Sequence, residues 1–219
     1  MCTPACFQSL RKKISGTVTC IKMNKFAVYK TCTYPSLNRG ISIQHKMNKP
    51  LHQFFTEDHH RIEHLLNRAT EQPGHIEMEY YHQFRVRLLR HIKMEEKTLF
   101  PAAKKANLKV MESLIPRFRL EHGALTALLV PPPTTGIINA IRHVLEKHDL
   151  AEEEPGGLYD VCEALTHGQT QELLQQLAAV EEVPVHPPNP APIAIDAARR
   201  ALERAGYNFD EIGKEPNGQ

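Results

Sequence analysis

Apolar residues, together with a few His and Glu, recur along the chain at the spacing of an α-helix in four successive segments. Within each segment they fall three and four positions apart, which draws a single stripe along one face of a helix. The stripes comprise Phe55, His59, Ile62 and Leu66; Phe84, Leu88, His91, Glu95 and Leu99; Ile115, Phe118, His122, Leu125 and Leu129; and Ile138, Ile141, Leu145, His148 and Glu152. The pattern predicts four amphipathic helices.

Helix-breaking residues separate the four segments at short intervals. The breaks are Gln72-Pro73-Gly74, Phe100-Pro101 at the end of the second helix, Pro131 to Pro133 followed by a cap at Thr134 or Thr135, and Pro155-Gly156-Gly157. No segment alternates with a period of two for long enough to indicate a sheet. Narrow stripes joined by short connections favour an all-α fold, an antiparallel up-down-up-down four-helix bundle.

The rest of the chain divides around this bundle, which we assign to residues 47–182. Residues 1–46 are predicted to be a basic disordered leader, either an organelle transit peptide or an overextended start, because Met47 opens the first folded segment. Residues 158–165 and a short helix over 171–180 are expected to pack across one end of the bundle. Residues 183–219 read as a Pro-rich linker and a short C-terminal helix over 193–205, which either docks on the bundle or stays apart.

Composition and charge exclude several classes of function. The net charge is +2, but residues 1–46 hold eight of the 27 basic residues and none of the 25 acidic ones, so the remainder is mildly acidic. Such a body offers no face for nucleic acid, and no segment is apolar enough to span a membrane. Four of the five Cys lie in residues 1–46, which favours a reducing, cytoplasmic location unless that segment targets an organelle.

Histidine is abundant, with 13 in 219 residues, and four of the histidines occupy stripe positions, where a bundle normally buries Leu or Ile. The polar residues at stripe positions are His59, His91, Glu95, His122, His148 and Glu152. Burying six such groups without partners would cost several kcal/mol each, about 2–7 by transfer data. A metal pair in the core would supply the common partner.

The spacing and chemistry of these six residues suit two metal ions. His91 with Glu95, and His148 with Glu152, stand four apart and therefore one turn along the same face. Four imidazole nitrogens and two carboxylates favour a pair of non-haem iron ions, with manganese or zinc as weaker alternatives. If both carboxylates bridge and an oxo or hydroxo group joins the ions, one position per ion stays open for dioxygen, peroxide or nitric oxide.

Four motifs resemble the hemerythrin-like, HHE cation-binding domain family over about residues 50–180. They are Asp58 to Ile62, His91 to Glu96 with Leu99-Phe100-Pro101, Glu121-His122, and His148 to Glu154 with Leu158-Tyr159. The resemblance implies the up-down-up-down bundle around a di-iron site with the same six ligands.

The chain departs from the oxygen-carrying members of this family. Their third helix supplies two histidines four apart, whereas Thr126 follows His122 here, and Glu152 takes the bridging role more naturally than Glu153. The set is most similar to the four-His, two-Glu site of proteins that repair iron centres or handle nitric oxide.

Several residues near the stripes have competing interpretations. His60 and His64 form a rival chelating pair on the outer face of the first helix, although solvent exposure fits their position better. Glu96, Glu153 and Glu154 are expected to be solvated or to orient a ligand histidine. Tyr80 or Tyr81 either lines an access route or packs in the core, and Cys162 is expected to pack behind the site. Six further histidines, His52, His75, His82, His143, His167 and His186, are assigned to the surface or to loops.

The functional expectation is a di-iron protein that binds a small oxidant or lends iron in oxidative, nitrosative or iron stress, rather than a turnover enzyme. The alternative is a sensor or interaction module, in which metal occupancy changes the docking of residues 190–219. A third possibility, a bundle whose histidines bind nothing, predicts a protein without stoichiometric metal.

Overall fold

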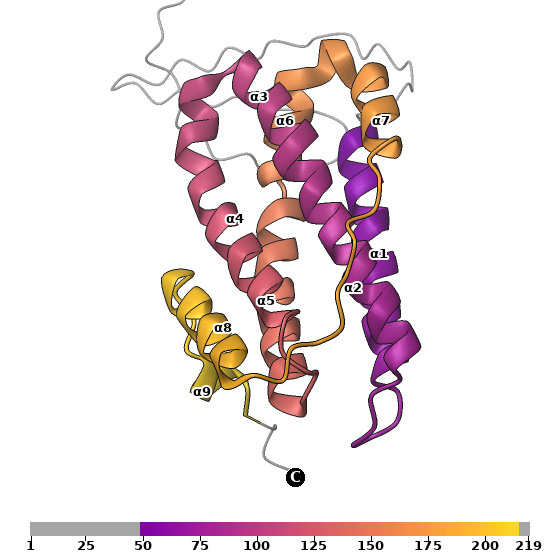
Figure 1. Ribbon diagram of the computed structural model, residues 1–219. Coiled ribbons are helices and arrows are strands. Elements are labelled where there is room, and N and C mark those ends of the chain that lie inside the picture. Colours follow the sequence, from indigo (N-terminus) through magenta and orange to yellow (C-terminus); the bar gives the residue numbers. More distant parts are fainter. Residues whose placement is uncertain (1–48, 215–219) are drawn as a thin grey trace, which may run out of the picture. The chain divides into compact units, whose positions relative to one another are not determined.

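The computed structural model describes residues 49–214, and every regular element in that range is a helix. Four helices are long: α1 (Pro50–Ala69), α2 (Met78–Met94), α4 (Leu108–Leu128) and α5 (Thr135–Glu153) (Figure 1). They correspond to the four predicted stripes. Predictions about residues 1–46 lie outside the described residues.

The helix ends follow local chemistry. Pro50 opens α1, where its missing N–H costs no hydrogen bond. The turn after α1 contains Gly74 in the left-handed region, with a φ of 73°. As predicted, Thr134 caps α5, because its hydroxyl accepts a hydrogen bond from the backbone N–H of Ile137 at 3.3 Å.

The second helix does not end near Phe100-Pro101, so this predicted boundary was wrong. A π-helical turn, η1 (Glu95–Leu99), follows α2 directly and leads into α3 (Phe100–Ala106). The wider turn lets the backbone N–H of Phe100 bond to the carbonyl of Glu95, and Pro101 falls at the start of α3, where proline is tolerated. Such turns are frequent at functional sites, and this one begins at Glu95.

Shorter helices follow α5. The expected segments appear as α6 (Leu158–Thr166), a single 3-10 turn η2 (His167–Gln169) and α7 (Thr170–Ala178). Helix α6 packs against α1, α3 and α5, and α7 packs against α1 and η1. Figure 1 shows α6 and α7 together beside α3. Asp160 of α6 pairs with Lys49 and Glu163 accepts from the backbone N–H of Leu51, so α6 lies against the start of α1.

The C-terminal segment docks on the long helices, which decides between the two predicted alternatives. Residues 180–190 run without regular structure, and Arg90 on α2 donates a hydrogen bond to the carbonyl of Val180 at 2.7 Å. Helix α8 (Pro192–Arg204) then packs on α4 and buries Ala198 and Leu202, while α9 (Phe209–Ile212) contacts α5.

Two apolar clusters fill the interior, and the buried polar residues lie between them along each long helix. On α1 the order is Phe55 in one cluster, His59, then Ile62 in the other. Helix α2 passes in the opposite order, from Leu88 through His91 to Met94. The polar layer is therefore enclosed by hydrophobic surface. No helix within residues 49–214 is long and apolar enough to cross a membrane.

Candidate metal centre

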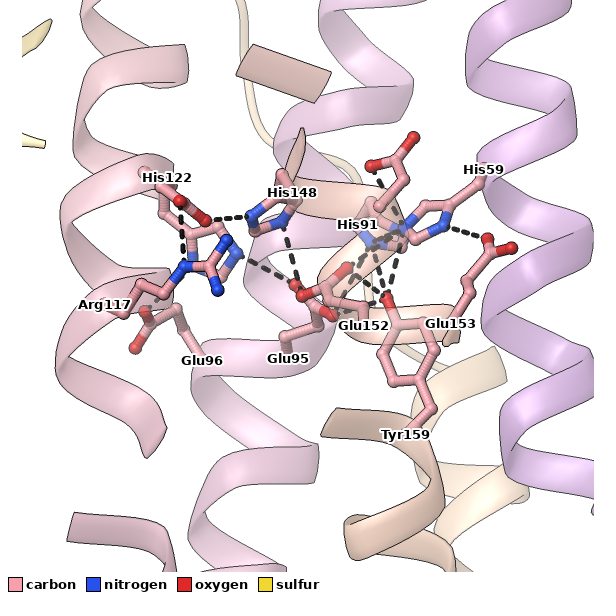
Figure 2. A network of polar contacts seen from close by, with 12 residues as sticks. His59, His91, Glu95, Glu96, Arg117, His122, His148, Glu152, Glu153 and Tyr159 are labelled. Atoms are coloured by element: carbon pink, nitrogen blue, oxygen red, sulfur yellow. Dashed lines mark hydrogen bonds and ion pairs between the residues drawn. The ribbon is translucent and has the colours of Figure 1, made fainter. Parts of the chain in front are cut away.

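All six predicted ligand residues are buried and lie together in the polar layer (Figure 2). They come from five elements: His59 from α1, His91 from α2, Glu95 from η1, His122 from α4, and His148 and Glu152 from α5. His59 is the most exposed of the six, at 5%. Because stripe positions face inward on every helix, the helical period directs these side chains to the core, and the packing of the helices brings them to one level.

The donor atoms form two groups, which we name by their histidines. In the His59–His91 half, the two Nε2 atoms lie 3.0 Å apart. Glu152 Oε2 lies 3.3 Å from His59 Nε2, and Glu95 Oε1 lies 3.7 Å from His91 Nε2. The donors of His59, His91 and Glu152 therefore converge on one point, and Glu95 adds a more distant oxygen on the side of His91.

The His122–His148 half repeats this arrangement with the remaining carboxylate oxygens. Glu95 Oε2 lies 3.0 Å from His122 Nε2, and Glu152 Oε1 lies 3.3 Å from His148 Nε2. Each of the two glutamates thus directs one oxygen to each half, as Figure 2 shows for the carboxylates in the centre. Buried His and Glu groups in this arrangement could hold a metal ion, because the donor atoms of His122, His148, Glu95 and Glu152 lie within 4.8 Å of one another, as do those of His59, His91 and Glu152.

A carboxylate holds the outer nitrogen, Nδ1, of every one of these histidines. The pairs are His59 with Glu153 at 2.6 Å, His91 with Asp58 at 3.0 Å, His122 with Glu96 at 3.0 Å and His148 with Glu121 at 2.9 Å. An imidazole that donates its Nδ1–H outward presents the lone pair of Nε2 inward. All four rings are thereby oriented as metal ligands require.

These outer carboxylates are in turn paired with arginines in three of the four cases. Arg87 donates to Asp58, Arg119 to Glu96 at 2.9 Å and Arg117 to Glu121 at 3.2 Å. Burial opposes ionisation of Asp58, yet His91 and Arg87 keep its pKa below the usual value. The hydrogen bond from His59 lowers the pKa of Glu153 in the same way. The outer groups therefore stay anionic acceptors.

Without a cation, protons balance the charges of the inner groups. Burial opposes protonation of His122, but Glu95 and Glu96 raise its pKa to about 10. Burial likewise opposes ionisation of Glu95, while the surrounding histidines hold its pKa well below the usual value. The site thus attracts positive charge strongly, and a metal ion would replace these protons.

The two halves differ in how their donor atoms are satisfied. In the His122–His148 half, three buried atoms have no hydrogen-bond partner: His122 Nε2, Glu95 Oε2 and Glu152 Oε1. Buried polar atoms are rarely left unpaired, because each costs about 1–3 kcal/mol. Three such atoms facing one another fit the requirements of a cation.

The His59–His91 half is instead occupied by the hydroxyl of Tyr159, the second residue of α6. Its Oη lies 2.7 Å from Glu95 Oε1, 2.8 Å from Glu152 Oε2, 3.1 Å from His59 Nε2 and 3.4 Å from His91 Nε2. Burial and the two carboxylates raise the pKa of Tyr159 well above its ordinary value. The sequence placed Tyr159 in the fourth motif of the family resemblance but gave its hydroxyl no role, because the residue lies outside the four stripes.

Asp149 is a second residue that the sequence did not reveal. Its Oδ1 is buried without a hydrogen-bond partner and lies 3.8 Å from His59 Nε2. Burial raises the pKa of this carboxyl group. Its position beside His148 places it off the stripe of α5, so periodicity alone gave no signal for it.

Other side chains near the site follow the predictions in most cases. His60 and His64 are exposed, so the rival pair on α1 does not contribute. Glu96 and Glu153 orient ligand histidines as expected, whereas Glu154 is exposed. Tyr81 packs in the core, and Cys162 is a buried free thiol in the cluster beside the site.

Of the histidines assigned to the surface, His75, His82, His167 and His186 are exposed, and His52 and His143 are half-buried. None of these six belongs to the two groups of buried donor atoms.

Comparison of the chain with models of protein families, with curated proteins and with solved structures found no match.

Proposed function

We propose that this chain is a hemerythrin-like protein that binds two non-haem iron ions through His59, His91, Glu95, His122, His148 and Glu152. The observation that carries the proposal is the paired geometry of the donors. Two histidine nitrogens face one oxygen of each glutamate in either half, and three of these atoms have no hydrogen-bond partner.

The order of the apolar clusters along the helices supports a hemerythrin-like bundle. Helices α1 and α4 run from the cluster of Phe55 and Phe118 towards that of Ile62 and Leu125, and α2 runs the opposite way. On α5, Leu145 precedes His148 and the partly buried Ala151, which packs on the first cluster. This alternation is what an up-down-up-down arrangement of the four long helices requires.

The donor set favours iron over other metals. Structural zinc is held by four ligands, often thiolates, whereas no Cys belongs to either group of buried donors in residues 49–214. A mixture of imidazole and carboxylate suits iron or manganese, and bridging glutamates on facing helices are typical of di-metal carboxylate sites. We therefore assign two irons, with manganese as the nearest alternative.

Bound iron would supply redox chemistry and positions for a small ligand such as dioxygen, peroxide or nitric oxide. The protein's own contribution is orientation and enclosure. The outer carboxylates fix the ring nitrogens, and the apolar clusters on both sides restrict water and lower the local dielectric. Such a site fits a role in oxidative, nitrosative or iron stress, which we propose takes place in the cytoplasm.

Metal analysis of the full chain, purified with and without oxygen, tests this proposal. We expect about two irons per chain after anaerobic reconstitution. The absorption of the oxidised protein should bleach with dithionite, and the reduced protein should form a nitric oxide adduct. One zinc per chain, or no iron after reconstitution, would contradict a di-iron site.

A specific contact favours a second candidate, a metal-dependent sensor. The hydroxyl of Tyr207, between α8 and α9, donates to Glu121 Oε1 at 3.2 Å. The other oxygen of Glu121 accepts from His148 Nδ1 at 2.9 Å. This chain of hydrogen bonds joins the C-terminal segment to a ligand histidine, so metal occupancy could bias its docking.

Hydrogen exchange of residues 192–214, measured with and without iron, separates the two candidates. A sensor requires that iron binding change the protection of α8 and α9. Equal protection in the two states would reject the sensor and leave the di-iron binding protein.

A further inference from the structure

Tyr159 places its hydroxyl where a metal ion of the His59–His91 half would lie. Four donor atoms of that half surround Oη at 2.7 to 3.4 Å. A hydroxyl carries one hydrogen and can therefore donate to only one of them at a time. The other three atoms depend on protons carried by the histidines, whereas one cation would be shared by all four.

A second buried tyrosine shows that this environment is not a general property of tyrosines in the core. Tyr81 is as fully buried as Tyr159, but its hydroxyl has no hydrogen-bond partner and its ring stacks on Phe84 in the other cluster. Packing therefore suffices to hold a tyrosine in this protein. The convergence of four ligand atoms on Tyr159 calls for a different explanation.

The ring of Tyr159 is held so that its hydroxyl cannot leave the site easily. It stacks on Phe55 with a centroid distance of 4.9 Å and an interplanar angle of 18°. The residue is 1% exposed, and α6 packs against α1, α3 and α5. When an ion enters, a small shift must take the hydroxyl off the central point. Oη starts 3.1 Å from His59 Nε2, closer than Asp149 Oδ1 at 3.8 Å, so it is the better placed additional oxygen.

Given the di-iron site proposed above, we propose that Tyr159 Oη is a seventh protein ligand, bound to the ion of the His59–His91 half. Coordination to ferric iron breaks the O–H bond and forms an O–Fe bond, and the proton is released to water. The two metal positions then differ: tyrosine fills the first, and small ligands bind at the His122–His148 half.

The His122–His148 half supports this division, because no hydroxyl approaches its donors within the described residues. Its three unpartnered atoms face each other without an intervening side-chain group. Tyr207 reaches only Glu121, on the outer side of His148. A small molecule that enters this half would meet an ion with no tyrosine ligand.

Resonance Raman and absorption spectra of the full chain loaded with ferric iron test the proposal. We expect a phenolate-to-iron charge-transfer band in the visible region, with phenolate ring vibrations enhanced on excitation within it. Tyr159→Phe should lose both signals while retaining its iron content. Tyr81→Phe is the matched control, because it removes an equally buried hydroxyl outside the site, and it should keep both signals.

The possible outcomes are distinguishable. Iron-loaded wild type without phenolate vibrations, or a band that persists in Tyr159→Phe, would overturn tyrosine ligation and leave the di-iron proposal intact. Absence of iron from wild type would overturn the di-iron proposal itself, and tyrosine ligation with it. If Tyr159→Phe does not fold, the wild-type and Tyr81→Phe spectra still decide, since the vibrations report directly on a bound phenolate and, within the described residues, Tyr159 is the tyrosine whose hydroxyl reaches the inner donors.

Discussion

The two halves of the candidate centre have the same inner donors but different surroundings. Each combines two histidine nitrogens with one oxygen from Glu95 and one from Glu152. The hydroxyl of Tyr159 fills the His59–His91 half, whereas the other half leaves three atoms unpartnered. The long helices and η1 thus supply equivalent donors to both halves. The short helix α6 makes the halves different, because it adds the hydroxyl of Tyr159 to only one of them.

The outer contacts extend this contrast. In the His59–His91 half, Asp58 is fully buried, and its partner Arg87 is half-buried. In the other half, the arginines on Glu96 and Glu121 are about half exposed, and Glu121 also meets the C-terminal segment through Tyr207. The second half therefore meets the surface through two arginines and the C-terminal segment, whereas the first half meets it through Glu153, whose side chain is 28% exposed.

The largest expected effect comes from removing a carboxylate that both halves share. Glu95→Gln keeps the size of the side chain but cannot place a charged oxygen in each half. We expect loss of both irons, measured by metal analysis after reconstitution. Glu154→Gln is the control, because this glutamate is exposed and outside both donor groups. Retention of two irons in Glu95→Gln would show that the halves do not share this ligand.

Removing a histidine should affect one half more than the other. His91→Ala deletes a ligand and leaves buried Asp58 without its imidazole partner, so we expect about one iron per chain and a loss of roughly 3 kcal/mol in unfolding free energy. Metal analysis and chemical denaturation measure the two effects. His60→Ala, on the exposed face of α1, should change neither. Loss of iron in His60→Ala but not in His91→Ala would remove His91 from the ligand set and make His60 the ligand on α1.

The sequence revealed the residues of the long helices because one physical rule governs them. A residue at a stripe position faces the core, so the periodicity of the apolar residues is enough to mark His122 or Glu152 as a buried polar group. The same rule anticipated Glu96 and Glu153, which stand one position away from a ligand.

Contacts between distant segments could not be predicted from the periodicity of apolar residues. Tyr159 meets His59 across 100 positions, and Tyr207 meets Glu121 across 86. Both depend on how α6 and α8 dock, which the period of a single helix does not encode. The extension of the second helix past Pro101 was missed because a π turn changes the rule for proline locally.

Metal uptake should depend on pH because iron must displace protons from the histidines. The pKa of His122 is raised to about 10 in the metal-free site, so this ring is protonated at neutral pH. Affinity should therefore fall as pH falls, by up to about tenfold per unit for each proton released. Calorimetric titration with ferrous iron, in buffers of different ionisation enthalpy, counts the protons. Binding without proton release would contradict this account of the site.

The raised pKa of His122 also makes the stability of the metal-free protein depend on pH. This stability should fall as pH rises, whereas metal affinity should increase. A histidine whose pKa is raised on folding stabilises the folded state below its unfolded pKa, and this contribution declines as pH rises to the folded value. For His122 the decline should run from about pH 6.5 to about pH 10. Denaturation of metal-free protein across this range, compared with His122→Gln, measures it. An equal pH dependence in the two proteins would exclude His122 as the source.

The smallest expected effect tests the link between the second half and the C-terminal segment. Tyr207→Phe removes one hydrogen bond of 3.2 Å at a half-buried position, and Glu121 keeps its contacts with Arg117 and His148. We therefore expect unchanged iron content and a loss of about 0.5–1 kcal/mol in unfolding free energy. If this half communicates with the surface through Tyr207, the variant should also lose any iron-dependent change in hydrogen exchange of α8. Such a change that persists in Tyr207→Phe would require another route between the site and the C-terminal segment.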